Sequence, residues 1–338
     1  MCALFGFLDC GRRIPIKALQ KLLQALANAS EVRGDHASGI SYMKGEQLTI
    51  YKRPKPAHKM KFKLPKDTSA VMGHTRYTTQ GSQEFNQNNH PFRGNADKEF
   101  ALAHNGVLSN DMELRKIKQL PKTNIETDSY IAVQLIEAQK ALNFDTLRSM
   151  AEDVRGNFTF TVLDETNTLW FIKGNSPLNL IYFPELNFYV YTSTSSIMAT
   201  ALKHTPLRSL HYEVIEAEEG DILRITPDGK LARDQFRVPF VMSSRFNSRL
   251  KYSISDIAGW DYEEEDDFDV EEEEEEFDLM DDEDYSYLID LCGYFNVSRN
   301  TVLRLLHLGY TYDEIEEYLY SSDMFDDDDD LCSFCGEL

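Results

Sequence analysis

A cysteine directly follows the first methionine, and this position gives its thiol a chemical use. Aminopeptidase removes methionine when the next side chain is small, so we expect Cys2 to become the first residue, with a free α-amino group. That amine has a reference pKa of about 7.7–8.0 and can act as the general base for the thiol at neutral pH. One residue would then supply both nucleophile and base, although a cysteine that only packs is the alternative for Cys2 taken alone.

An arginine lies in a second segment that can do chemistry, GHTRYTTQG at residues 73–81, directly after an apolar strand-like run. The planar guanidinium of arginine can hold an α-carboxylate through two parallel hydrogen bonds. Arg76 is therefore a candidate for binding the carboxylate of an amino acid. For a lone arginine, a surface salt bridge is the alternative interpretation.

Two further segments supply the remaining polar groups of a site for an amino acid. In HNGVLSN, Asn105 and Gly106 offer a side-chain amide and an unhindered backbone N–H side by side, the two donors of an oxyanion hole. An Asn-Gly pair is also an ordinary turn. In ETDS at 126–129, Asp128 can hold an ammonium group or can interact with a helix N-terminus. The four pieces together indicate a thiol-dependent site for an amino acid.

The order of these motifs resembles that of the class II glutamine amidotransferase domain, an N-terminal-nucleophile hydrolase. The sequence is similar to the glutaminase halves of glucosamine-6-phosphate synthase and amidophosphoribosyltransferase over roughly residues 2–235. The motifs that carry the resemblance are, in chain order, CALFGF, EVRGDHASG, GHTRYTTQG, NHPF, HNGVLSN, ETD, RGNFTF, GNSPL, YTSTSS and EEGDI.

The resemblance implies a role for each matching residue of the site. Cys2 would attack the side-chain amide of glutamine, and Asn105 and Gly106 would form the oxyanion hole. Arg76 would bind the substrate carboxylate and Asp128 its amino group. The activity implied is a glutamine amidohydrolase or amidotransferase that releases ammonia through a glutamyl thioester, with no cofactor and no metal.

The resemblance also assigns supporting residues and shows two departures. Tyr77 stands where the family has an aromatic side chain on a mobile loop, Thr79 belongs to the same loop, and Arg33 matches an arginine that supports the N-terminus. The RG-x-D pattern of the family places an acid at His36, and the histidine that often follows the arginine loop is Gln80 here. Neither position performs the chemistry, so the departures concern the detail of the loop.

The elements that must position these motifs are mostly short strands. Residues 2–8 read as a buried strand, a helical pattern follows Pro15, and a second helix is predicted from about 127 to 141. Further strand-like runs span residues 38–43, 48–52, 70–75, 100–104, 157–163, 168–172, 178–183, 188–192 and 221–225. This order favours an α+β fold with stacked sheets. The family resemblance implies a four-layer αββα sandwich.

The charge of the chain is divided unevenly, which separates a folded part from an acidic tail. The net charge of −22 combines −28 in residues 261–338 with +6 in the first 260 residues. We therefore predict a glutamine amidotransferase type 2 domain at 1–240, an acidic disordered linker at 241–284, a small helical interaction segment at 285–322 and an acidic C-terminal tail at 323–338.

The same composition excludes several classes of protein and leaves the partner open. No apolar run is long enough for a membrane span and no signal peptide is visible, so we expect a cytoplasmic protein without membrane contact. Acidic flanks around the helical segment exclude nucleic acid as its partner. The five cysteines do not form a disulfide framework, and the lone Cys332–Cys335 pair is a poor zinc site.

The residues after 240 contain no phosphate loop and leave no room for an ammonia-accepting domain. We therefore expect glutamine as substrate and an acceptor enzyme supplied in trans through the C-terminal segment. Two alternatives stay open: a stand-alone hydrolase of another γ-glutamyl amide, and a non-catalytic interaction protein with an acidic tail.

Overall fold

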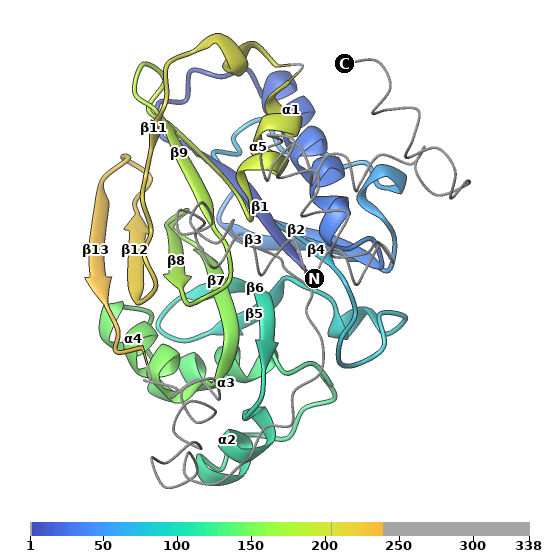
Figure 1. Cartoon of the computed structure of the whole chain (residues 1–338), viewed down its shortest axis with the longest axis vertical. Coiled ribbons are helices and arrows are strands. Elements are labelled where there is room, and N and C mark those ends of the chain that lie inside the picture. The colour runs from blue at the N-terminus through green and yellow to red at the C-terminus, as the bar shows by residue number, and fades with distance from the viewer. Residues whose placement is uncertain (1, 204, 239–338) are drawn as a thin grey trace, which may run out of the picture. The chain divides into compact units, whose positions relative to one another are not determined.

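The computed structural model of the chain describes residues 2–203 and 205–238 (Figure 1). The predicted linker at 241–284, the helical segment at 285–322, the tail at 323–338 and the Cys332–Cys335 pair lie outside the described residues. No helix among residues 2–203 and 205–238 is long and apolar enough to cross a membrane.

Two antiparallel sheets form the centre of the fold (Figure 1). The seven-stranded sheet has the order β11 (Glu213–Val214), β9 (Asn179–Phe183), β10 (Phe188–Thr192), β1 (Ala3–Asp9), β4 (Ala70–Arg76), β2 (Ala37–Lys44) and β3 (Gln47–Arg53). The six-stranded sheet has the order β13 (Leu231–Gln235), β12 (Asp221–Ile225), β8 (Leu169–Lys173), β7 (Gly156–Asp164), β6 (Glu99–Leu108) and β5 (Phe92–Asn95). The predicted α+β fold with stacked antiparallel sheets is therefore confirmed.

Helices cover the outer face of each sheet. The seven-stranded sheet packs against α1 (Ile16–Ala29) and α5 (Ser195–Leu202). The six-stranded sheet packs against α3 (Tyr130–Gln139) and α4 (Phe144–Asp153), and a short helix α2 (Asp111–Ile117) follows β6. Short 3-10 helices span Ser30–Arg33, Ala57–Lys59, Asn86–Asn88 and Pro206–Ser209. The described chain thus has its layers in the order helices, sheet, sheet, helices.

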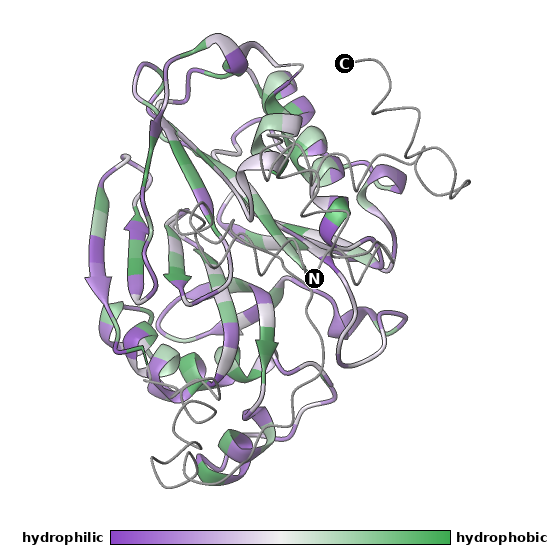
Figure 2. Ribbon diagram, viewed as in Figure 1, coloured by the Kyte–Doolittle hydropathy of each residue, from purple (hydrophilic) through white to green (hydrophobic). Residues whose placement is uncertain are grey.

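Strand β1 shows why the N-terminal segment reads as a continuous apolar run. Phe5 and Phe7 pack toward α1 and α5, whereas Leu4 and Leu8 pack between the two sheets. A strand that is buried on both faces loses the alternation of polar and apolar residues. Figure 2 shows β1 as a mainly hydrophobic strand in the middle of its sheet. The strand predicted at 2–8 is confirmed as Ala3–Asp9.

The helices were predicted less completely than the strands. The helical pattern after Pro15 is α1, and the helix predicted at 127–141 is the shorter α3, so Asp128 lies before the helix rather than in its first turn. Three short helices, α2, α4 and α5, carried no sequence prediction. Side-chain caps begin two of them, because Asn143 accepts from Thr146 N and Thr194 accepts from Ile197 N. Helices of 7 to 10 residues are too short for a clear periodic pattern.

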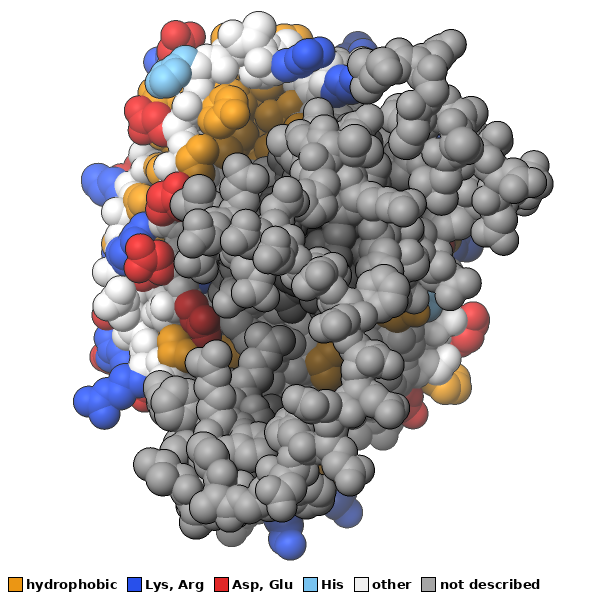
Figure 3. All heavy atoms as spheres, viewed as in Figure 1, with side chains coloured by type: hydrophobic (Ala, Val, Ile, Leu, Met, Phe, Trp, Pro, Cys, Tyr) orange, Lys and Arg blue, Asp and Glu red, His pale blue; other side chains and the backbone are white. Residues whose placement is uncertain are grey.

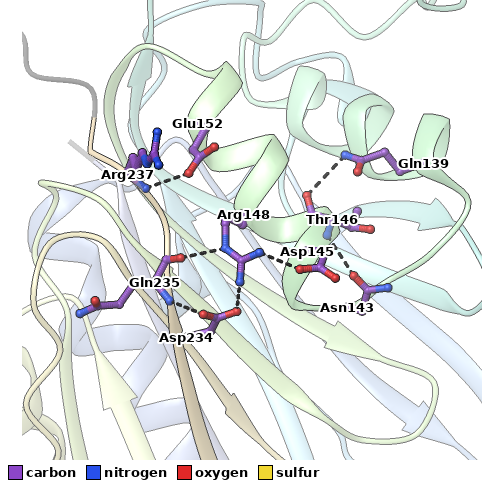
Figure 4. Close-up of polar contacts among 9 residues, drawn as sticks. All are labelled: Gln139, Asn143, Asp145, Thr146, Arg148, Glu152, Asp234, Gln235 and Arg237. Carbon is purple, nitrogen blue, oxygen red and sulfur yellow. Dashed lines mark hydrogen bonds and ion pairs between the residues drawn. The ribbon is translucent and has the colours of Figure 1, made fainter.

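Polar contacts hold the last described strand to the helical layer (Figure 4). Arg148 on α4 donates to the carbonyl of Gln235 at 3.0 Å and to Asp145 at 2.6 Å, and it also contacts Asp234. The backbone N–H of Arg237 donates to Glu152 at 2.9 Å. Hydrogen bonds therefore connect the chain to the folded domain as far as residue 237.

Candidate active site

The alternation of side chains along three strands brings the predicted site residues to one end of the layer between the sheets. Side chains that fill this layer include Leu4 of β1, Met72 of β4 and Ala103 of β6. Because every second residue of a strand points to the same face, Cys2, Arg76 and Asn105 point into the same layer. The register of β1 and β4 pairs Ala3 with Thr75, which places Cys2 opposite Arg76. All three side chains are buried.

The Cys2 thiol lies in a buried position with few hydrogen-bond partners. Its Sγ donates to the carbonyl of Tyr77 at 3.5 Å, and its own carbonyl accepts from Arg33 Nε at 2.9 Å. Burial raises the pKa of the thiol, so the protonated form is favoured and a base is required to activate it. Among the residues that the structure describes, no imidazole or carboxylate hydrogen-bonds to this sulfur.

The Arg76 guanidinium is oriented by its own loop. Nη1 donates to Asn89 Oδ1 at 2.7 Å, and Nη2 donates to the carbonyls of Gln80 and Gly81 at 2.6 and 2.9 Å. These bonds use three of the five N–H donors and leave Nε–H and one Nη1–H for a ligand. The carbonyls hold the guanidinium in place, while two donors are left for an acceptor such as a carboxylate.

Asn105 and Gly106 have the properties that an oxyanion hole requires. Asn105 is 2% exposed, and its Nδ2 is buried without a hydrogen-bond partner among the described residues. An unsatisfied buried donor costs free energy unless a ligand completes it. Gly106 has a φ of +141°, and a Cβ at this position would lie 1.9 Å from the carbonyl oxygen of Asn157. Glycine is therefore required at position 106.

Asp128 lies beside β6, the strand that carries Asn105 and Gly106, although 20 residues separate Asp128 from Leu108 at the end of that strand. Its Oδ2 accepts from the backbone N–H of Leu108 at 2.6 Å, two residues after Gly106. Burial lowers the pKa of Arg76, whereas the charges of Cys2 and Asp128 act in the opposite direction. Asp128 is a buried carboxylate, 3% exposed, whose negative charge favours the charged form of the arginine.

Three histidines near the site, His74, His90 and His104, are buried. His74 Nε2–H donates to the carbonyl of His104 at 2.9 Å, and the rings of His74 and His90 are 4.1 Å apart. Burial lowers the pKa of His74 to about 3, so its ring is neutral and acts in packing. Within residues 2–203 and 205–238, no group of three or more His, Cys, Asp or Glu side chains is arranged to hold a metal ion.

The loop after Arg76 contains two predicted supporting residues, Tyr77 and Thr79, and further contacts that were not predicted. Tyr77 stacks on His36, but Thr79 is exposed and makes no hydrogen bond with a described residue. Its neighbour Thr78 is bound instead, through its backbone N–H to His36 Nδ1 and through Oγ1 to Gln83. The contact of Asn89 with Arg76 was also missed, although the NHPF motif contains that residue.

Two further features lie near the loop that follows Arg76, the Lys52 side chain and a cavity. Lys52 is partly buried and donates to the carbonyls of Asn89 and Pro91, and desolvation lowers its pKa to about 8. A cavity of about 550 Å³ lies between the loop and α2, and its lining includes Gln80, Arg115 and Glu126. This cavity does not contain Cys2, Arg76 or Asn105, so it is not the place where the thiol would meet an amide.

Comparison with known proteins gives one family match. The family model described as a glutamine amidotransferase domain matches residues 74–199, which include Arg76, Asn105, Gly106 and Asp128. Two curated relatives are named glutamine–fructose-6-phosphate aminotransferase (isomerizing). The protein from Fusobacterium nucleatum is 26% identical over 245 residues and the protein from Staphylococcus aureus 25% identical over 249 residues.

These relatives are longer than the part of this chain that they match. The matches cover 70% of this chain but only 37% and 39% of the two relatives. Among solved structures, glutamine phosphoribosylpyrophosphate amidotransferase from B. subtilis superimposes with a TM-score of 0.55 and 22% identity, covering 70% of this chain and 50% of that chain. The structural likeness shows that the two proteins share a fold over this region.

Proposed function

This chain contains a class II glutamine amidotransferase domain, and from that premise we propose that it hydrolyses the side-chain amide of glutamine with Cys2 as the nucleophile. The observation that carries the proposal is the buried, unpartnered amide of Asn105 in the same layer as Cys2 and Arg76. An unpaired donor in the same layer as a thiol and an oriented arginine fits a substrate with a carboxylate and with an amide carbonyl that becomes an oxyanion when the thiol attacks.

In the proposed first half-reaction, the Cys2 thiol gives its proton to the α-amine of the same residue and the sulfur attacks the amide carbon. The carbonyl oxygen gains negative charge, which Asn105 Nδ2 and the N–H of Gly106 stabilise. As the C–N bond breaks, the amine returns the proton to the leaving nitrogen and ammonia departs. A glutamyl thioester remains on Cys2.

In the second half-reaction, water attacks the thioester carbon and the α-amine accepts a proton from that water. The C–S bond breaks, glutamate leaves, and the thiol is restored with its proton. Arg76 would hold the α-carboxylate and Asp128 the α-ammonium group through both halves. This chemistry needs an unblocked amine on Cys2, because the raised pKa of the buried thiol leaves it protonated without a base.

The purified protein provides the test of this mechanism. We expect intact-mass measurement to show a chain that begins at Cys2, and we expect that chain to release glutamate from glutamine. Retention of Met1 in an active preparation would rule out the α-amine as the base. A preparation that begins at Cys2 but releases no glutamate, alone or with cell extract, would contradict glutamine hydrolysis.

The acceptor of the ammonia forms a second part of the proposal. The names of the relatives state that fructose 6-phosphate and phosphoribosyl pyrophosphate are used by those proteins, which extend well beyond the matched region. Residues 239–338 of this sequence hold 31 acidic and 5 basic residues. We propose that this segment binds an acceptor enzyme in trans. Figure 3 shows acidic and basic side chains interspersed on the described part of the face in view.

Arg76 should contribute mainly to substrate binding. Arg76→Ala removes hydrogen bonds to a charged group that exist in both the ground and transition states, so the KM for glutamine should rise about 10- to 100-fold with kcat little changed. Steady-state glutamate release measures both constants. Arg93→Ala, which removes an exposed arginine from β5, is the matched control and should leave both unchanged. A fall in kcat with an unchanged KM would contradict the assignment of Arg76 to the carboxylate.

A further inference from the structure

We infer that His36 is a positioning residue for the peptide group that orients the Cys2 thiol, an inference that rests on the proposed function. The backbone pairing of β2 with β4 ends where Ala37 lies opposite Arg76. One more backbone bond follows, from His36 N to the carbonyl of Arg76 at 3.0 Å. After Arg76 the chain leaves the sheet and enters its loop.

The His36 side chain continues the contact where the backbone ladder stops. The backbone N–H of Thr78 donates to His36 Nδ1 at 3.1 Å. The imidazole also stacks on the Tyr77 ring, with centroids 4.9 Å apart and planes inclined by 26°. Gly34 permits this close approach, because a Cβ at position 34 would lie 2.3 Å from Tyr77 N. One side chain thus contacts both residues at the start of the loop.

The two hydrogen bonds lie on the same peptide group. The carbonyl that accepts from Cys2 Sγ belongs to Tyr77, and the N–H that donates to His36 belongs to Thr78. These are the two ends of one planar peptide unit, so fixing the N–H fixes the direction of the carbonyl. His36 therefore acts on the nucleophile through the Tyr77–Thr78 peptide without contacting the substrate.

An imidazole at position 36 can both accept a hydrogen bond from Thr78 and stack on Tyr77. Because Thr78 N–H is a donor, His36 Nδ1 must be the unprotonated nitrogen of the ring. The side chain thereby combines a neutral acceptor with an aromatic face for Tyr77. These two contributions can be separated, because asparagine keeps an acceptor at the same distance along the side chain whereas phenylalanine keeps only the ring.

The experiment compares His36→Phe with His36→Asn in the full chain. We expect His36→Phe to lower kcat for glutamine about five- to tenfold, the loss of one hydrogen bond, with KM changed less than about twofold. His36→Asn should keep kcat within about twofold of the unchanged protein. A general structural role would instead make both variants lose activity in proportion to a fall in Tm, which thermal melting measures alongside.

Hydrogen–deuterium exchange gives a readout that does not depend on activity. The peptide that contains Thr78 should exchange faster in His36→Phe and at the original rate in His36→Asn. Unchanged exchange and unchanged kcat in His36→Phe would overturn the inference. If exchange responds as expected but the wild-type protein releases no glutamate, the hydrogen bond between His36 and Thr78 is confirmed. The proposed glutamine hydrolysis, and with it the positioning role of His36, are then both overturned.

Discussion

Cys2→Ala should abolish the release of glutamate, lowering kcat by at least about 10⁴-fold, because the variant keeps the α-amine but has no atom that can form the thioester. The substitution removes only the sulfur from a site that is otherwise intact, so glutamine should still bind. A coupled glutamate assay measures the loss, and a binding assay with glutamine checks that the site remains formed. Thermal melting of the same preparation shows whether the variant is folded.

Cys10→Ala is the matched control for this variant. Cys10 is the second cysteine of the described chain, and it lies at the end of β1 with its Sγ 3.8 Å from the carbonyl of Thr226. Burial, reinforced by the charges of Asp9 and Asp228, raises its pKa to about 12, which makes it a poor nucleophile. The control should keep nearly full activity. Equal losses in the two variants would mean that the nucleophile is wrongly assigned.

Asn105→Ala should lower kcat by about 10²–10³-fold and leave the KM for glutamine nearly unchanged, because an oxyanion-hole donor acts on charge that develops only in the transition state. The Asn105 amide has no protein partner among the described residues, so its removal breaks no hydrogen bond of the folded protein. Stability should therefore fall little, and the kinetic effect can be read without correction for misfolding.

The control for this prediction is Asn95→Ala, which removes an exposed asparagine at the end of β5. It should leave kcat and KM unchanged. Asn105→Asp adds a second comparison, because it keeps the size of the side chain but replaces the donor with a negative charge that repels an oxyanion. We expect it to be at least as inactive as Asn105→Ala. An increase in KM alone would remove Asn105 from the oxyanion hole.

The sequence by itself identified the residues that can do chemistry and the strands that carry them. The Cys2, Arg76 and Asn105–Gly106 motifs are local, and each combines a reactive or binding side chain with a strand whose apolar residues are visible beside it. The buried strand β1 and the helix α1 were predicted for the same reason, since a long apolar run or a regular helical period is a property of consecutive residues. The structure places these three motifs together at one end of the inter-sheet layer, at which the side chains of Cys2, Arg76 and Asn105 are buried.

Only the tertiary structure decided how those residues are held. The guanidinium of Arg76 is oriented by Asn89 and by carbonyls of its own loop, and Asp128 binds Leu108 N instead of serving the helix α3. Thr78 rather than Thr79 makes the loop contacts, and its partner His36 comes from a different strand connection. The physical reason is that these bonds either close an irregular loop on itself or join it to a segment distant in the sequence. Such bonds depend on strand register and on backbone direction in three dimensions, which no periodic pattern of neighbouring residues records.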